Sequence, residues 1–581
     1  MNDPNLPSIK QDSSAENNNS GNMYSYRDEN NINNPKELES GAIRRSIGEG
    51  NPNTNFPKSS FNPGYEPNYI NNNPVPIKYS QNLNDNTDNS ILNWAFCLIF
   101  GIVEILMIIL IAIFFKWDIR NDPKYTKEIN GECKDSDENI IEILCNSTES
   151  ELNEYYGLFR DINIMIFVGF GMLHALLKKY SWTSISINMI AIVFSFQIGL
   201  FTNLLWKNAF KEKWKAGLLN FKTLIQSNFN SCSVLISLGC VLGKLSIIQY
   251  LIMIILETIF SSLNFQLCLV KLKAIDVGGS LYIHTFGAIF GLAIYMVLFC
   301  STKMKTALKD YSFYNNGNYF SHIIAFIGVI FIWCYFPSFN AGLAFNNNYR
   351  YRSTINTYLS LSGSVVGSFI TSALYNKGRY VIEQILFGSF SGGVIISGCS
   401  TVCIDHYASL ILGFLCSGIC VTFLSKIKPF FINWGYEDIF NIIIIHGIPG
   451  LLSSFITPMM IGDFQNRYIK NNIHYLIFDD ERTSAQQAGI QIGAIFITIA
   501  ISFTSGIATG YLMKIATCGK IDNYFIDSEF FLDKENIINI FEDNQILPQE
   551  ITDKPFLFQN KMEFPPQQSK SDFRGSQPSY N

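Results

Sequence analysis

The stretch ILNWAFCLIFGIVEILMIILIAIFF, residues 91–115, is a long run of apolar side chains that contains one acidic residue, Glu104. A helix needs about 20 consecutive apolar residues to cross the hydrocarbon core of a bilayer, so this stretch is long enough to span it. Similar runs recur along the chain, and only 15% of all residues are charged, against about a quarter in a soluble domain. The sequence therefore predicts an integral membrane protein.

Further apolar segments predict an all-α polytopic membrane protein. It has about twelve transmembrane helices if short or Gly-rich spans are accepted inside a bundle. The clear candidates are 91–115, 182–206, 247–270, 281–300, 320–336, 355–374, 407–424, 439–461 and 488–513. Weaker, Gly-rich candidates are 162–177, 232–242 and 385–400. The membrane that holds the protein, plasma membrane or an endomembrane compartment, is not encoded in this pattern.

Polar segments flank the predicted transmembrane domain, which covers residues 91–515. Residues 1–90 are rich in Asn, Ser and Pro and have few apolar clusters, a composition that predicts a disordered tail. This tail has no apolar core of a cleavable signal peptide, so we expect the first span to direct insertion. Residues 516–581 are also polar. We expect both tails to be cytoplasmic. The net charge of -5 says little about partners, because the charges lie in loops and tails, and we expect no nucleic-acid partner.

The first long loop, residues 116–161, predicts the orientation in the membrane. It carries the glycosylation pattern Asn-Ser-Thr at Asn146 together with Cys133 and Cys145, which predicts an extracytoplasmic loop with a glycan and a possible disulfide. With twelve spans, both termini then lie inside. Lys and Arg are more numerous in the loops that this topology places outside, so the positive-inside rule does not support it, although long loops contribute little to that rule.

Two similar segments place a histidine in the middle of an apolar run. DVGGSLYIHTFGAIFG begins at Asp276 and contains His284, and DIFNIIIIHGIPG begins at Asp438 and contains His446, so each Asp precedes its His by eight residues. The segments fall in the sixth and eleventh predicted spans. The two halves of the chain would therefore have opposite orientations, which is typical of an inverted repeat with its functional site between the halves.

The spacing predicts different roles for the aspartates and the histidines. Eight helical residues rise about 12 Å, so neither Asp reaches its own His. Asp276 and Asp438 are expected either to accept backbone N–H groups at a helix start or to shape a pore mouth. A single buried histidine is often a satisfied core residue, but His284 and His446 at matching depths can meet and share one proton between two ring nitrogens.

These motifs resemble the ammonium transporter/Rh glycoprotein family, and in particular its Rh branch. The resemblance rests on VKLKAIDVGGSLYIHTFGAIFGL, on CYFPSFNAG, residues 334–342, and on IIHGIPG, which follow one another along the chain in this order, and it extends over about residues 91 to 515. It implies a homotrimer in the lipid bilayer, with an inverted repeat around a pore in each protomer.

The resemblance also assigns roles to individual residues. It implies that His284 and His446 are the twin pore histidines, and that Asp276 and Asp438 are the paired vestibule aspartates. Phe339 falls on the inner phenylalanine of a stacked extracellular gate. Phe229 falls on the outer one.

Three departures from the family pattern concern the lining of the predicted pore. Ile443, Ile444 and Ile445 replace the polar His-Asn pair that Rh proteins tend to carry before the second histidine, which predicts a drier wall. Phe336 replaces a Trp, and Asn228 replaces an acidic residue next to the outer phenylalanine. The last change argues against strong recruitment of cations from outside.

The expected function is passage of ammonium as NH3, with carbon dioxide or methylammonium as further candidates. Transfer of a bare cation into a dry lumen costs on the order of tens of kcal/mol, so a narrow apolar pore rejects potassium, sodium and intact ammonium. Ammonium would lose a proton near Asp276 and the rings of Phe229 and Phe339, where cation–π attraction contributes about 0.5–2 kcal/mol. Electroneutral and electrogenic transport both stay open.

Two alternatives belong to other classes of protein. A non-conducting Rh-like scaffold would have no reason to keep polar rings in the pore. An intramembrane metalloenzyme would need three or four His, Asp or Glu ligands at one depth, but only two histidines, His284 and His446, lie deep in the predicted spans. Glu104 and His174 are expected in interhelical or interfacial contacts. We therefore expect neither an enzyme nor a cofactor or metal.

Overall fold

The computed structural model describes residues 86–117, 128–129, 132–133, 138–211, 214–301, 308, 316–344, 347–433, 436, 438–468, 482–515, 524–527 and 530–531. Side chains are described from residue 98 onward within these ranges, except for 128–150 and 464–468. The chain divides into two units, residues 1–70 and 71–581, and all described residues belong to the second.

The described part is built from helices, several of which contain π-helical turns, written η. The first half contains α1 (Asn86–Phe114), α2 (Glu138–Ile164), η2 (Met165–Phe170), α3 (Gly171–His174), α4 (Ser181–Ala209), α5 (Phe221–Val241), α6 (Ile247–Phe265), η3 (Gln266–Lys271), η4 (Ser280–Thr285) and α7 (Phe286–Phe299). Four short strands, β1 (Phe115–Trp117), β2 (Glu128–Ile129), β3 (Glu132–Cys133) and β4 (Gly217–Leu219), pair as β1 with β4 and β2 with β3.

The second half of the chain is also helical and also contains π-helical turns. It contains α9 (Tyr319–Ala341), α10 (Asn347–Tyr375), α11 (Ile382–Gly388), α12 (Ser391–Ile396), α13 (His406–Thr422), η5 (Phe423–Ile427), α14 (Lys428–Asn433), η6 (Ile443–Gly447), α15 (Ile448–Tyr468) and α16 (Ser484–Ile515). Among the described residues, nine helical segments are long and apolar enough to cross a membrane. The predicted all-α, polytopic class is confirmed, and every predicted span contains helix, whereas the number twelve stays a prediction.

The helices that contain two of the predicted spans begin earlier than those spans, because polar helix ends escape a hydropathy window. The helix α2 begins at Glu138, so Asn146 lies within a helix, and the bounds 116–161 of the extracytoplasmic loop stay a prediction. The helix α5 begins at Phe221, capped by Asn220, and therefore contains Phe229 well inside it. The side chains of Cys133, Cys145 and Asn146 lie outside the described part, so the disulfide and the glycan stay predictions.

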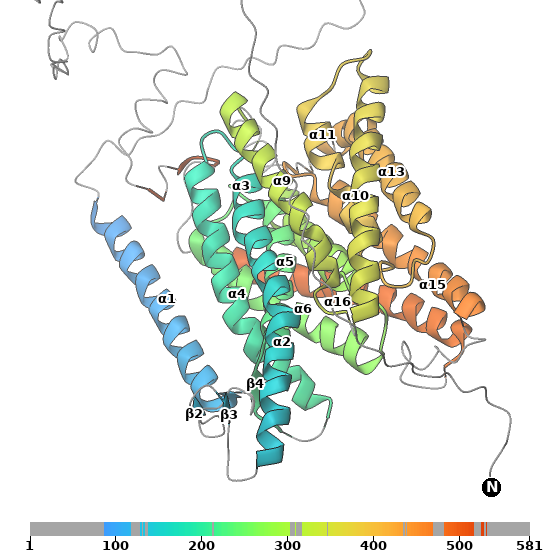
Figure 1. The fold of residues 1–581 in the computed structure, drawn as a ribbon. Coiled ribbons are helices and arrows are strands. Elements are labelled where there is room, and N and C mark those ends of the chain that lie inside the picture. The colour runs from blue at the N-terminus through green and yellow to red at the C-terminus, as the bar shows by residue number, and fades with distance from the viewer. Residues whose placement is uncertain are drawn as a thin grey trace, which may run out of the picture. The chain divides into compact units, whose positions relative to one another are not determined.

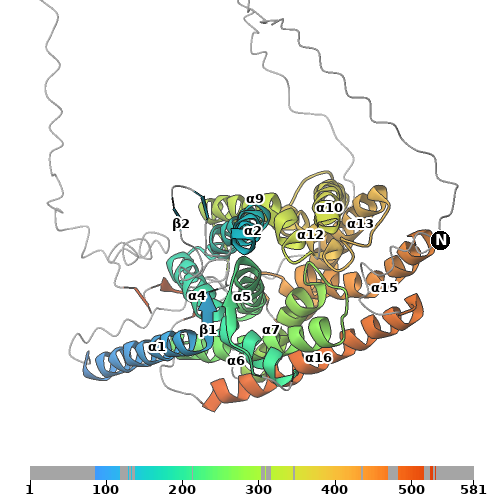
Figure 2. The same ribbon diagram turned by 60° about the horizontal axis from the view of Figure 1, so that its bottom comes forward.

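Small residues let the helices approach closely, as expected where lipid offers no hydrophobic drive for helix association. A Cβ added to Gly287 of α7 would lie 2.7 Å from the carbonyl oxygen of Ser233 in α5. Likewise a Cβ on Gly413 of α13 would lie 1.8 Å from the carbonyl oxygen of Ser360 in α10. Figures 1 and 2 show α10 and α13 side by side.

The two ends of the bundle can be told apart by what packs on them. At one end, which we call the tail face, Phe525 N donates to Gly243 O at 3.0 Å, and Asp527 accepts from Thr183 N at 2.7 Å. At the other end, which we call the loop face, β1 pairs in parallel with β4. The helix α4 runs between the two faces, from Thr183 near its start to β4 shortly after its end.

Candidate functional site

The two predicted histidines contact each other in the middle of the bundle. His284 Nδ1 lies 3.1 Å from His446 Nδ1, and the two rings are stacked with a 13° angle and centroids 5.2 Å apart. Both side chains are buried. One Nδ1 must donate and the other accept, so the pair shares one proton, and the contact predicted from the repeat is confirmed. His284 Nε2 has no hydrogen-bond partner among the described residues.

Each histidine is carried by a π-helical turn that follows a left-handed residue. Gly279, with φ of 80°, precedes η4 and His284, and Asn441, with φ of 55°, lies just before η6 and His446. Gly and Asn are the residues that adopt this backbone conformation most readily. Short π-helical turns are uncommon and occur frequently at functional sites. The two segments thus repeat a local fold as well as a sequence pattern.

The carboxylate of Asp276 supports the first of these turns by accepting hydrogen bonds from groups of the turn. Its Oδ1 accepts from Ser280 N and Ser280 Oγ, both at 2.6 Å, and its Oδ2 accepts from Leu281 N at 2.7 Å. Burial raises the pKa of the Asp276 carboxyl to about 6, and these hydrogen bonds act in the opposite direction. Of the two roles expected for Asp276, the helix-start role matches these contacts.

Asp438 has a similar place before the second turn. Its Oδ2 accepts from Ile443 N at 3.1 Å and from Tyr436 Oη at 3.2 Å. Burial raises the pKa of this carboxyl above its ordinary value, while the Ile443 hydrogen bond lowers it. Its Oδ1 has no hydrogen-bond partner among the described residues. Asp438 therefore supports a helix start with one oxygen and leaves the other free.

Aromatic rings lie next to the histidine pair on the side of the loop face. Phe229 and Phe339 are fully buried, with ring centroids 4.6 Å apart and a 47° angle between planes. The Phe339 ring lies 6.3 Å from His284, and the Phe336 ring lies 6.1 Å from it. The two phenylalanines come from α5 and α9, and Phe339 is the one next to the histidine, as expected for an inner ring.

Further rings flank the pair on the tail-face side, and sequence reasoning missed them. Phe170 stacks on His446 at 6.4 Å, and Phe390 lies 5.8 Å from it. His174 lies 6.0 Å from Phe170, and its Nδ1 donates to Asn188 Oδ1 at 2.9 Å. The predicted interhelical contact of His174 is therefore confirmed. The spacing of four between Phe170 and His174 placed both on one helix face, but nothing in the sequence placed that face beside His446.

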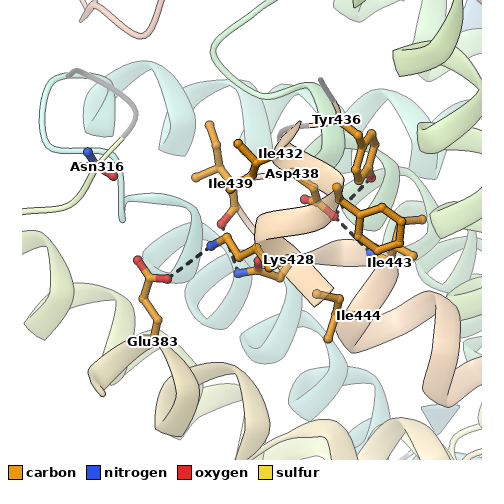
Figure 3. Close-up of a pocket in the computed structure, with 11 residues that line it drawn as sticks. Asn316, Glu383, Lys428, Ile432, Tyr436, Asp438, Ile439, Ile443 and Ile444 are labelled. Carbon is orange, nitrogen blue, oxygen red and sulfur yellow. Dashed lines mark hydrogen bonds and ion pairs between the residues drawn. The ribbon is translucent and has the colours of Figure 1, made fainter. Parts of the chain in front are cut away.

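A cavity lies at each end of this line of rings. The loop-face cavity is lined by Phe265, Lys273, Asp276, Tyr282, Leu343, Tyr349 and neighbouring residues. The tail-face cavity is lined by Asn316, Glu383, Lys428, Tyr436, Asp438, Asn441, Ile443 and Ile444 among others, and Figure 3 shows Asp438 and Tyr436 close together in it. Ile443 and Ile444 thus line part of the tail-face cavity, while the drier pore wall stays a prediction.

Glu104 of α1 makes a contact with α4. Gln197 Nε2 donates to Glu104 Oε1 at 3.2 Å, which confirms an interhelical contact for Glu104. Within the described ranges, no three His, Cys, Asp or Glu side chains lie close enough to hold a metal ion.

Comparison with known proteins extends over most of the chain. The family model described as Ammonium Transporter Family matches residues 141–523. The chain is 28% identical over 476 residues to "Ammonium transporter Rh type C" of Homo sapiens, covering 80% of this chain and 94% of that protein. It is 29% identical over 452 residues to the Rh type C protein of Xenopus laevis, covering 76% and 92%.

Solved structures agree on the fold. The Rh50 channel of Nitrosomonas europaea matches with a TM-score of 0.56 at 22% identity, covering 70% of this chain and 98% of that one. Mep2 of Saccharomyces cerevisiae matches with a TM-score of 0.50 at 16% identity, covering 65% and 90%. Since the family model covers more than half of the sequence and the curated relatives are Rh proteins, this multi-pass membrane protein belongs to the ammonium transporter family, in its Rh branch.

Proposed function

We propose that the chain transports ammonium across a membrane by passing NH3 along the line from Phe229 and Phe339 to His284 and His446. The observation that carries this proposal is the 3.1 Å contact between the two Nδ1 atoms inside an apolar aromatic sheath. A membrane-buried polar pair is costly and is expected to serve a functional pathway. Membership in the ammonium transporter family supports ammonium as the substrate.

The apolar rings along the proposed path select against ions. Phe336 and Phe339 are buried and lie beside the His284 ring, and the buried Phe229 ring lies against Phe339. Desolvation of a bare monovalent cation costs on the order of tens of kcal/mol in such surroundings, whereas NH3 carries no net charge. Ammonium therefore has to give a proton to water in the loop-face cavity, beside Asp276, before it enters as NH3.

The histidine pair offers NH3 hydrogen bonds without adding charge. With one proton shared between the Nδ1 atoms, both imidazoles are neutral. The Nε2 atom of each ring takes no part in this contact, and His284 Nε2 has no partner among the described residues. NH3 can both donate and accept hydrogen bonds, so it can replace some of its hydration there, which potassium cannot do.

The test is stopped-flow fluorimetry on proteoliposomes that contain a pH-sensitive dye. Addition of ammonium outside should alkalinise the interior faster than in protein-free liposomes, because NH3 enters and binds a proton. A parallel run with a carbon dioxide gradient, which acidifies the interior, and another with methylammonium measure the further substrates. Equal ammonium rates with and without correctly folded protein would contradict the channel.

The assembly and topology are proposed with the same function. We place residues 1–90 and 516–581 in the cytoplasm as tails of the 91–515 channel domain, and we propose a homotrimer with one such line per protomer. A non-conducting scaffold is the alternative. The buried histidine pair favours the channel over a scaffold, since a scaffold gains nothing from polar rings in this position.

A further inference from the structure

One acidic side chain is enclosed where α5, α6 and the start of α7 meet. Glu257 of α6 is fully buried, and its Oε1 lies 2.6 Å from Ser237 Oγ and 3.1 Å from Ser233 Oγ, both on α5. Its Oε2 has no hydrogen-bond partner among the described residues. Buried carboxylates are normally paired with a cation or bound to a metal, so two serine hydroxyls are unusual partners for an ionised group.

The hydrogen atoms available to this cluster decide the form of the carboxyl group. Ser237 Oγ also lies 2.7 Å from the carbonyl oxygen of Gly287 in α7. A serine hydroxyl has one hydrogen, and a carbonyl oxygen has none. If Ser237 donates to Gly287 O, the 2.6 Å contact with Glu257 Oε1 needs a hydrogen on the carboxyl group. If Ser237 donates to Glu257 instead, two oxygens lie at 2.7 Å with no hydrogen between them. Only a protonated Glu257 gives a hydrogen to both contacts.

The Gly287 carbonyl belongs to the helix that continues from His284. Gly287 follows His284 by three residues, which is about one helical turn. On one side this segment packs closely on α5, where a Cβ added to Gly287 would lie 2.7 Å from Ser233 O. On the other side it packs on α15, where a Cβ added to Gly450 would lie 3.0 Å from His284 Cβ. A shift of α7 against α5 would therefore change the 3.1 Å contact between His284 and His446.

The proton of Glu257 sets the direction of the Ser237 hydroxyl. Serines within helices commonly donate to a carbonyl one turn back in their own helix, which for Ser237 is that of Ser233. With an O–H of Glu257 directed at its oxygen, Ser237 donates across to α7 instead. The chain of donors ends at Gly287 O, a backbone carbonyl that has no proton to pass on. This arrangement suits the positioning of a helix and does not suit a proton relay.

We propose that Glu257 is a neutral, protonated carboxyl group that positions His284 by directing the Ser237 hydroxyl to the backbone of α7. Glu257 acts through Ser237 and Gly287 and is a positioning residue. The consequence for ammonium flux rests on the proposed transport function, whereas the proton and the position of the histidine are measured without transport.

Infrared spectroscopy of the purified full chain in lipid at neutral pH tests the proton. A protonated carboxyl group has a carbonyl stretch that carboxylates and amides lack. We expect the wild-type spectrum to contain such a band and Glu257→Gln to lose it. Glu154→Gln is the matched control and should keep the band, because Glu154 Oε1 forms a 2.9 Å ion pair with Arg350 Nη1. Identical wild-type and Glu257→Gln spectra in this region would make Glu257 a carboxylate and overturn the proposal.

NMR of isotope-labelled histidine ring nitrogens tests the positioning. The chain has six histidines, and the spectrum of His284→Ala identifies the signals of the pair. Glu257→Gln should keep these signals, because its amide N–H can donate to Ser237 Oγ as the carboxyl group does. Glu257→Met, which has a similar length and no donor, and Ser237→Ala should shift them. Ser261→Ala is the control, because Ser261 is buried on α6 and, within the described part, donates only to Thr258 O of its own helix.

Ammonium flux separates this inference from the transport proposal. We expect Glu257→Met and Ser237→Ala to lose flux, and Glu257→Gln and Ser261→Ala to keep it. Unshifted histidine signals in both Glu257→Met and Ser237→Ala would overturn the positioning role, while transport by the wild type would stand. Shifted signals, together with a wild-type flux no faster than that of protein-free vesicles, would support the positioning role and contradict transport.

Discussion

Gly279 and Asn441 occupy equivalent places in the two halves of the protein. Each is the third residue after a buried aspartate, each has a positive φ, and each lies just before a π-helical turn that carries a pore histidine. The left-handed residue turns the chain from the aspartate into the helix. The 3.1 Å contact between the histidines therefore depends on two backbone positions that touch neither ring.

Replacement of Gly279 should disturb this arrangement. In Gly279→Ala, the new Cβ would lie 2.4 Å from Ile283 Cδ1 at a φ of 80°, so we expect a loss of about 1–2 kcal/mol from backbone strain alone and a lower ammonium flux. Gly378→Ala is the control, since Gly378 has a φ of 81° with open space around it. Thermal unfolding and flux are measured for both. Equal flux in the two variants would contradict a link between Gly279 and the histidine.

Loss of either pore histidine should change conduction more than expression. His284→Ala leaves the His446 nitrogen unpaired, at a cost of about 1–3 kcal/mol, but stability is spread over many helix contacts. We expect a lower ammonium flux, or a potassium leak once water enters. The double variant with His446→Ala should resemble the single variants, because members of one hydrogen-bonded unit are not additive. Singles that conduct and select like the wild type would make the histidines core residues only.

Truncation of the outer phenylalanine should weaken selectivity. Phe229→Ala removes a ring that lies 4.6 Å from Phe339 and opens the line of rings toward the loop face. We expect a measurable potassium leak in proteoliposomes, because water that fills the gap can hydrate a cation. Phe496→Ala is the control, since the Phe496 side chain on α16 is 63% exposed on the outside of the protomer. A potassium permeability equal to that of the control would argue against a gate.

The first loop provides a test of the topology. We expect a disulfide between Cys133 and Cys145 and a glycan on Asn146 when the protein is produced in a eukaryotic host. Glycosidase should then increase electrophoretic mobility, and Asn146→Gln should abolish that change. A protease added to sealed cells should leave the N-terminal tail intact. Unchanged mobility together with cleavage of that tail from outside would reverse the orientation.

The C-terminal segment should contribute to stability through Asp527. Its carboxylate accepts from Thr183 N and Thr183 Oγ1, both at 2.7 Å, and so caps the start of α4 from a distant part of the chain. Asp527→Ala should cost about 1–2 kcal/mol, as for other lost helix caps. Asp527→Asn, which keeps an acceptor oxygen, should cost less. Thermal unfolding of the purified protein compares them, and equal transitions would rule out this cap.

The sequence by itself determined the class of fold and the central pair of residues. Long apolar runs can lie in a bilayer only as helices, because every backbone polar group must be satisfied within the segment. The repeated spacing of Asp276 with His284 and of Asp438 with His446 then indicated two related helices with histidines at matching depths. Local composition and period were sufficient for these inferences, since both depend on neighbours in the chain.

Only the tertiary structure decided what surrounds the pair. Phe170 and Phe390 contact His446 from helices far apart in the sequence, and no period or motif distinguished them from the many other phenylalanines. The polar start of α5 was missed because burial against other helices stabilises it in spite of its composition. The open oxygen of Asp438 could not be foreseen either, since whether an acceptor is satisfied depends on the orientation of every donor packed around it.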